Sequence, residues 1–139
     1  MSEIVPYCDD ADLRAYEPKI FDYWNEYLTQ KLESNRIIDE MILPRLPGWL
    51  RLKIRNGEKT IGDVVRAADL KTCAIYHTLY LIFSWVNAER GDLYEHKAAR
   101  YLKLFREKLS SLSFDISTDE NPADFEEEVE DGGVQIFRA

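Results

Sequence analysis

Two histidines, His77 and His96, are the side chains best suited to general acid–base chemistry at neutral pH in this sequence of 139 residues. His77 lies within the most apolar run of the chain, which favours a core histidine that is hydrogen-bonded to a neighbour. His96 lies on the charged face of a predicted helix, which favours an exposed position. No nucleophile elbow, zinc-protease, phosphate-loop or dinucleotide-binding motif accompanies them. We therefore predict no catalytic residues, no cofactor and no enzymatic activity.

Acidic residues near the C-terminus partly match a calcium-binding loop. Asp115, Ser117, Asp119 and Glu126 fall at positions 1, 3, 5 and 12 of an EF-hand-like loop. Glu120 replaces the glycine that such a loop needs at position 6, so the sharp turn is compromised. We therefore predict no metal site and interpret these residues as part of a solvated tail.

The net charge of −8 is unevenly distributed along the chain. Residues 115–139 contain nine of the 26 acidic residues and one of the 18 basic residues, so they carry the whole net charge. Residues 1–114 are neutral overall. An acidic segment repels nucleic acid and suits a basic protein surface. We predict a helical body over residues 1–114 and an acidic, extended C-terminal tail over residues 115–139.

The tail ends in a short apolar segment, residues 134–138. An apolar strand at the end of a charged tether can add itself to the sheet edge of a partner protein. Fully extended, the 25 residues of the tail span at most about 80 Å. The alternative is a tail that folds back onto the body or stays disordered. The predicted partner-binding residues are Val134, Ile136, Phe137 and Arg138.

The elements that position these residues are mainly helices. The run from Cys73 to Val86 is apolar nearly all round, which is typical of a helix at the centre of a bundle, and it is too short to span a bilayer. The last two predicted helices form an αα-hairpin. A short helix is predicted from Asp9 or Asp10 through Ala15. A second is predicted over residues 18–34 and continues or restarts over residues 36–43, before Pro44 and Pro47. The two helices of the hairpin are one capped by Asp63 or Asp69 that runs to Ala88 and one from Asp92 to Leu112.

The aromatic residues before residue 28 have helical spacing. This spacing indicates core or subunit-interface positions, and too few basic residues are interleaved with them for a base-stacking platform. The residues concerned are Tyr16, Phe21, Tyr23, Trp24 and Tyr27.

In residues 49–61 the spacing of the apolar residues changes from every three or four positions to every second position. Leucine and isoleucine alternate with basic residues there, and Asn56-Gly57 follows, so the pattern predicts a β-hairpin, although a helix could also place these residues. Residues 45–66 contain six bases and two acids. This excess indicates a contact surface for phosphates or an acidic partner; the alternative is a solvated face. The candidate residues are Arg51, Lys53, Arg55 and Lys59.

The overall prediction is a mainly α fold: a small helical bundle with a central αα-hairpin, a β-hairpin insertion and an extended C-terminal tail.

The order of these parts resembles one known protein class. The motifs are Tyr7-x-x-x-x-Asp12-Leu13, Ala68-Asp69-Leu70-Lys71, Glu89-Arg90-Gly91-Asp92-Leu93-Tyr94-x-x-Lys97-Ala98-x-x-Tyr101, a helix closing through Phe105 and Leu109 to Phe114-Asp115-Ile116, and the terminal Val134-x-Ile136-Phe137-Arg138. In combination they are similar to the head–tail connector (adaptor or neck) proteins of tailed double-stranded-DNA bacteriophages. The resemblance covers nearly the whole chain.

The resemblance implies a structural virion protein made in the host cytoplasm and located in the neck, at the capsid portal vertex. Such subunits form a ring, typically of twelve copies, beneath the portal. The ring extends the DNA channel and provides a docking surface for the tail or stopper proteins. The implied partners are the portal protein, which the C-terminal segment contacts, a tail or stopper protein, and other copies of the chain. Packaged DNA passes without sequence-specific binding, and no membrane is involved. The alternative is a small helical DNA-binding or regulatory protein that acts as a dimer.

Overall fold

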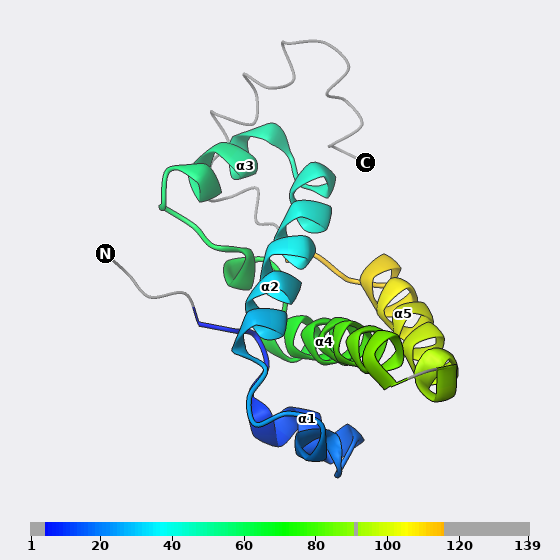
Figure 1. The fold of residues 1–139 in the computed structure, drawn as a ribbon. Helices are drawn as coiled ribbons and strands as arrows, with labels where there is room; N and C mark the ends of the chain where they lie inside the picture. The colour runs from blue at the N-terminus through cyan, green and yellow to red at the C-terminus, as the bar shows by residue number, and fades with distance from the viewer. Residues whose placement is uncertain (1–4, 91, 116–139) are drawn as a thin grey trace. The chain divides into compact units, whose positions relative to one another are not determined.

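The computed structural model of this chain describes residues 5–90 and 92–115. This part is mainly helical, as the sequence predicts (Figure 1). The described residues divide into two compact units, the first comprising residues 5–38 with 67–112 and the second residues 39–66 with 113–115. The elements are α1 (Asp10–Tyr16), η1 (Ile20–Asp22), α2 (Leu28–Ile42), η2 (Leu43–Arg45), α3 (Gly48–Arg55), η3 (Ile61–Asp63), α4 (Ala67–Arg90), η4 (Asp92–Tyr94) and α5 (Glu95–Ser110), where η marks a 3-10 helix.

An antiparallel pair, α4 and α5, forms the main part of the first unit, in agreement with the predicted αα-hairpin (Figure 1). Lys108 near the end of α5 places its Nζ 3.0 Å from Oδ1 of Asp69 near the start of α4. Between these ends, the ring centres of His77 on α4 and Phe105 on α5 lie 4.6 Å apart. Each buried apolar side chain stabilises such a pair by about 1.5–3 kcal/mol relative to its exposed state. None of the described helices combines the length and the apolar content that crossing a bilayer requires.

The first helix begins at the predicted cap. Asp9 accepts a 2.9 Å hydrogen bond from the backbone N–H of Asp12, and the Asp12 carboxylate accepts one of 2.9 Å from the backbone N–H of Asp9. This reciprocal capping box satisfies amide groups that the first turn leaves without helical partners. The bond from the Asp12 backbone also lowers the pKa of the Asp9 carboxyl. Leu13 then faces the core and is fully buried.

The helix predicted over residues 18–34 is wrong in its first part and confirmed over residues 28–34. The chain forms the short η1, and α2 begins only at Leu28, from which it continues without a break to Ile42. The reason is a tertiary contact of Tyr27, which is fully buried and donates its hydroxyl to the Ile20 carbonyl over 2.6 Å. In a continuous helix that carbonyl would accept from the backbone N–H of residue 24 instead. The predicted end of the helix before Pro44 is confirmed.

The predicted first residues of the two helices of the αα-hairpin also differ from the observed ones. Asp63 belongs to η3, where its carboxylate accepts a 2.8 Å bond from the Thr60 backbone N–H in a capping box. Asp69 lies in the first turn of α4, which begins two residues earlier at Ala67. Likewise, α5 begins at Glu95 rather than at Asp92, because η4 precedes it.

The β-hairpin predicted for residues 49–61 is wrong, because α3 occupies its first half and the described residues contain no strand. Burial explains the difference. Leu50 is 1% exposed and Leu52 is 52% exposed, although both would lie on the same face of a strand. In a helix, residues two positions apart point about 200° from each other, so one leucine is buried and the other faces solvent.

The Asn56-Gly57 pair ends α3 instead of forming a hairpin turn. Gly57 has a φ of +82°, in the left-handed region that glycine adopts without strain. The Gly57 N–H donates to the Ile54 carbonyl (3.1 Å), and the Glu58 N–H donates to the Lys53 carbonyl (2.9 Å). These are the two bonds of a Schellman motif. Because a type I′ turn and a helix end both need positive φ, the same dipeptide predicts either structure.

Candidate functional site

The helical form of α3 separates the four basic residues that the sequence predicts as one contact surface. Arg51 and Arg55 are four positions apart and therefore share a helix face. Lys53 points elsewhere, with its Nζ 3.8 Å from Oε1 of Glu58. Lys59 lies beyond the helix, where its backbone N–H donates to the Lys53 carbonyl over 3.3 Å. The structure thus brings together two of the four predicted residues.

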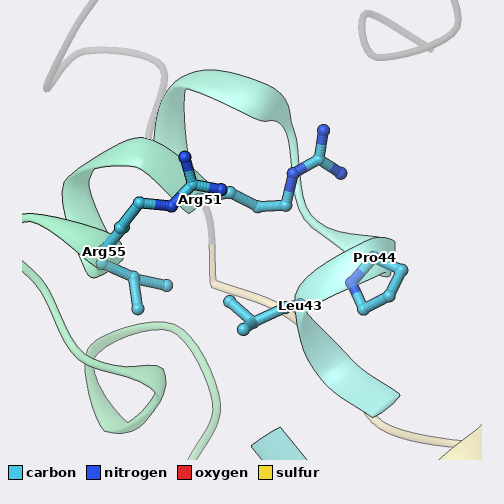
Figure 2. Close-up of a pocket in the computed structure, with 5 residues that line it drawn as sticks. Leu43, Pro44, Arg51 and Arg55 are labelled. Carbon is cyan, nitrogen blue, oxygen red and sulfur yellow. The ribbon is translucent and has the colours of Figure 1, made fainter. Parts of the chain in front are cut away.

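These two arginines border a pocket of about 460 Å³ in the second unit (Figure 2). Its apolar lining comes from Leu43 and Pro44 of η2 and from Ile54 of α3. In Figure 2, Leu43 points from η2 towards α3, Arg55 points towards Arg51, and Arg51 extends towards the segment before α3, where it bonds to the Leu46 carbonyl. We call this pocket the α3 groove. No sequence pattern indicates the apolar lining, whereas the i, i+4 spacing of the two arginines is evident once the segment is treated as a helix.

Arg51 is the more buried of the two groove arginines. It is half-buried, and its Nη1 donates to the Leu46 carbonyl over 3.0 Å. Arg55 is exposed. Within the described residues, neither guanidinium forms an ion pair with a carboxylate. A guanidinium presents a planar set of donors that matches carboxylate or phosphate oxygens, so the groove suits a ligand that is partly apolar and partly anionic.

The base of the acidic tail is also held within the second unit. The backbone N–H of Asp115 donates to the Val64 carbonyl over 2.7 Å. The guanidinium carbon of Arg45 lies 4.8 Å from the centre of the Phe114 ring. The predicted partner-binding residues lie outside the described residues, as does the rest of the tail; they are Val134, Ile136, Phe137 and Arg138.

Buried polar side chains of the first unit form a connected chain of contacts. Oγ of Ser34 lies 2.8 Å from Nδ1 of His77, and the Thr78 hydroxyl donates to Ser34 over 3.0 Å. The Cys8 sulfur lies 3.8 Å from the Thr78 hydroxyl. Burial lowers the pKa of His77 to about 4 and raises that of the Cys8 thiol to about 11. The predicted core position of His77 is confirmed, and the neutral imidazole serves as a partner for a buried hydroxyl.

A second polar cluster connects the end of α1 with α5. The Glu17 carboxylate lies 2.6 Å from Nζ of Lys97 and accepts a 2.5 Å hydrogen bond from the Tyr101 hydroxyl. Burial and this carboxylate raise the pKa of Tyr101. Glu17 was not predicted as part of a site, because no local pattern relates it to residues about 80 positions away. The predicted exposed position of His96 on α5 is confirmed.

Large apolar side chains are exposed on the first unit. Trp24 is 55% exposed, and its ring lies 6.1 Å from that of Trp85 in an edge-on arrangement. Leu28 is 49% exposed and Leu93 is 82% exposed. Trp85 is only partly exposed, so Trp24 contributes most of the accessible surface of this pair. An exposed tryptophan beside other exposed apolar side chains is typical of surfaces that bind another protein.

Among residues 5–90 and 92–115, no histidine, cysteine or carboxylate side chains converge in a group that could hold a metal ion. No family model matches the chain, and comparisons with curated proteins and with solved structures also find no match. The geometry of the described residues and the motifs of the sequence are therefore the basis for a functional assignment.

Proposed function

We propose that this chain is a structural virion protein, the head–tail connector of a tailed double-stranded-DNA bacteriophage. In this role it forms a ring beneath the portal, extends the DNA channel and presents a docking surface to the tail or stopper proteins. It resides in the neck of the virion. The observation that supports the proposal is a helical body that exposes large apolar side chains, Trp24, Leu28 and Leu93, which suits a subunit that completes its surface by assembly.

The motifs that resemble connector proteins coincide with packing positions of this body. Leu13 is fully buried, and Ala98 and Tyr101 face the interior from α5. Lys97 and Tyr101 both contact Glu17 at the end of α1. The resemblance therefore involves residues that hold the helices together, which supports a shared architecture.

The first unit supplies the proposed contacts between copies of the chain. Trp24, Leu28 and Leu93 expose large apolar areas whose burial is favourable at roughly 25 cal/mol per Å². A ring needs such a surface on each subunit, together with a complementary surface on the next copy, because head-to-tail contacts close into rings.

The tail supplies the proposed contact with the portal. The hydrogen bond from the Asp115 backbone N–H to the Val64 carbonyl holds the last described residue within the second unit. In the proposal, the acidic residues act as a spacer, and the apolar end adds to a sheet edge or groove of the portal. The anchoring side chains are Val134, Ile136, Phe137 and Arg138.

The deciding experiment mixes the purified full-length chain with the portal ring of the same phage and images the mixture by electron microscopy. We expect a ring of added density on one face of the portal, and its symmetry gives the copy number. A chain with Ile136→Asp and Phe137→Asp should lose this density, whereas the matched Glu127→Asp and Glu128→Asp variant, also in the tail, should keep it. Absence of any added density with the wild-type chain contradicts the proposal.

A second candidate function is DNA binding by a dimer, favoured by Arg51 and Arg55, which lack carboxylate partners among the described residues. Phosphate contacts make affinity fall with salt, with a slope close to the number of phosphates neutralised. Fluorescence anisotropy with a labelled 30-base-pair duplex, measured at several salt concentrations, tests this function. Binding that weakens steeply with salt and is lost in R51A/R55A favours the DNA-binding dimer; binding below detection at 50 mM salt excludes it.

A further inference from the structure

The α3 groove combines an apolar lining with two guanidinium groups. Leu43, Pro44 and Ile54 supply the apolar part, and Arg51 and Arg55 border it, around a volume of about 460 Å³ (Figure 2). A volume of this size accommodates one aromatic side chain with its flanking backbone. The groove therefore suits a peptide in which an apolar side chain lies between carboxylates.

The tail leaves the body from the same unit that carries this groove. Asp115 is bonded to Val64, and Phe114 lies against Arg45, so the last described residues of the chain are held in the second unit. Twenty-four residues follow Asp115. A segment tethered this closely has an effective concentration of about 1 mM for sites within its reach, so even a weak contact becomes populated.

The sequence of the tail contains the required pattern. Phe125 is flanked by Asp124 and Glu126, and it is the only aromatic residue between Asp115 and the apolar end of the tail. Phe125 is ten positions beyond Asp115, a span of at most about 33 Å when extended. The tail carries the whole net charge of −8, whereas residues 45–66 contain six bases and two acids. Charge and length both favour the tail of the same chain as the occupant.

We propose that the α3 groove binds the acidic tail of its own chain, with Phe125 against Leu43, Pro44 and Ile54 and the adjacent carboxylates of Asp124 and Glu126 on Arg51 and Arg55. Arg51 is pre-oriented for this contact by its bond to the Leu46 carbonyl. The apolar end of the tail begins nine residues beyond Phe125, so it remains available for another partner. This inference does not rest on the connector function.

Paramagnetic relaxation in the full-length chain tests the contact. A nitroxide is attached to a cysteine introduced by Ala123→Cys; the natural Cys8 and Cys73 are buried, and they are protected from labelling. We expect the α3 amide signals to lose at least half of their intensity in 50 mM salt and to recover it in 0.5 M salt, because the proposed contact is charge-assisted.

Two variants separate this contact from nonspecific attraction. F125A and R51A/R55A should each restore the α3 signals, whereas V129A in the tail and K103A/R106A on α5, which removes the same charge, should leave the broadening unchanged. F125A alters the tail alone, so its result holds even if R51A/R55A perturbs α3. Full intensity in the labelled wild-type chain overturns the proposal, as does broadening that survives F125A.

A mixed sample distinguishes binding within one chain from binding between copies. It contains ¹⁵N-enriched chain without the label and unenriched chain with the label. Unchanged α3 signals in the mixture support binding within the chain. Broadening in the mixture equal to that in the singly labelled sample overturns it in favour of exchange between copies.

Discussion

The charged and polar side chains of the two units differ in whether they have partners within the protein. In the first unit, Glu17 contacts both Lys97 and Tyr101, and the buried His77 is paired with Ser34. In the second unit, Arg51 and Arg55 border an open groove without a carboxylate partner among the described residues. Polar groups of the first unit therefore hold helices together, whereas the arginines of the second unit form no ion pair among the described residues and are the groups that we propose recognise a ligand.

The largest effect on stability should come from Glu17→Ala. This change removes the partner of the Tyr101 hydroxyl, which is nearly fully buried, and of Lys97. We expect a loss of about 3 kcal/mol in the free energy of unfolding, measured by urea denaturation followed by circular dichroism. Glu33→Ala, which removes an exposed pair with Arg36, should cost less than about 0.5 kcal/mol. Equal losses in both variants would show that the Glu17 contacts are not structural.

Lowering the pH should reduce the free energy of unfolding by a somewhat smaller amount. Burial lowers the pKa of folded His77 to about 4, whereas the unfolded chain takes up this proton near 6.5. The unfolded state therefore binds more protons between these values, and stability falls as the pH drops through them. Between pH 7 and pH 5 we expect His77 to account for a loss of about 2 kcal/mol.

Two glutamine variants isolate this contribution. H77Q should flatten the dependence of the unfolding free energy on pH in this range, and H96Q, which alters an exposed histidine, should leave it as in the wild type. A wild-type slope retained in H77Q would place the responsible proton on another group.

An intermediate effect is expected at the end of α3. Gly57→Ala should cost about 1 kcal/mol, because a φ of +82° is unfavourable for a residue with a Cβ even where no atom obstructs it. Gly62→Ala is the matched control. Its Cβ would lie at an ordinary 3.6 Å from the Thr60 hydroxyl, so we expect no loss of stability in the same urea titration. A neutral Gly57→Ala would argue against the Schellman cap.

The smallest effect on stability should come from the groove arginines. R51A/R55A should reduce the free energy of unfolding by less than about 1 kcal/mol, since the double variant loses the bond from Arg51 to the Leu46 carbonyl but no ion pair among the described residues. Thermal unfolding monitored by circular dichroism checks this expectation. A loss of more than about 2 kcal/mol would place the arginines with the structural groups of the first unit and remove the contrast between the units.

Local patterns predicted the parts of the fold that depend on residues close in sequence. The capping box of Asp9 and Asp12, the apolar run of α4 and the buried stripe of α5 are all readable within a few turns of helix. The break between Ile20 and Tyr27 is not, because it depends on burial of the Tyr27 ring in the core and on the bond from its hydroxyl to the Ile20 carbonyl, and residue spacing indicates neither. The candidate site was predicted in part: Arg51 and Arg55 belong to it, but Lys53 is turned away.

The sequence by itself determined a mainly helical chain, a central αα-hairpin and the separation of a neutral body from an acidic tail, because these follow from residue periodicity and charge. Only the tertiary structure decided whether the alternating segment before Asn56-Gly57 became strand or helix. An i, i+2 alternation followed by Asn-Gly is compatible with a β-hairpin. It is equally compatible with a short helix that buries Leu50, exposes Leu52 and ends in a glycine cap. Packing of Leu50 into a core settles the choice, since burial of one side chain outweighs the small difference in intrinsic propensity.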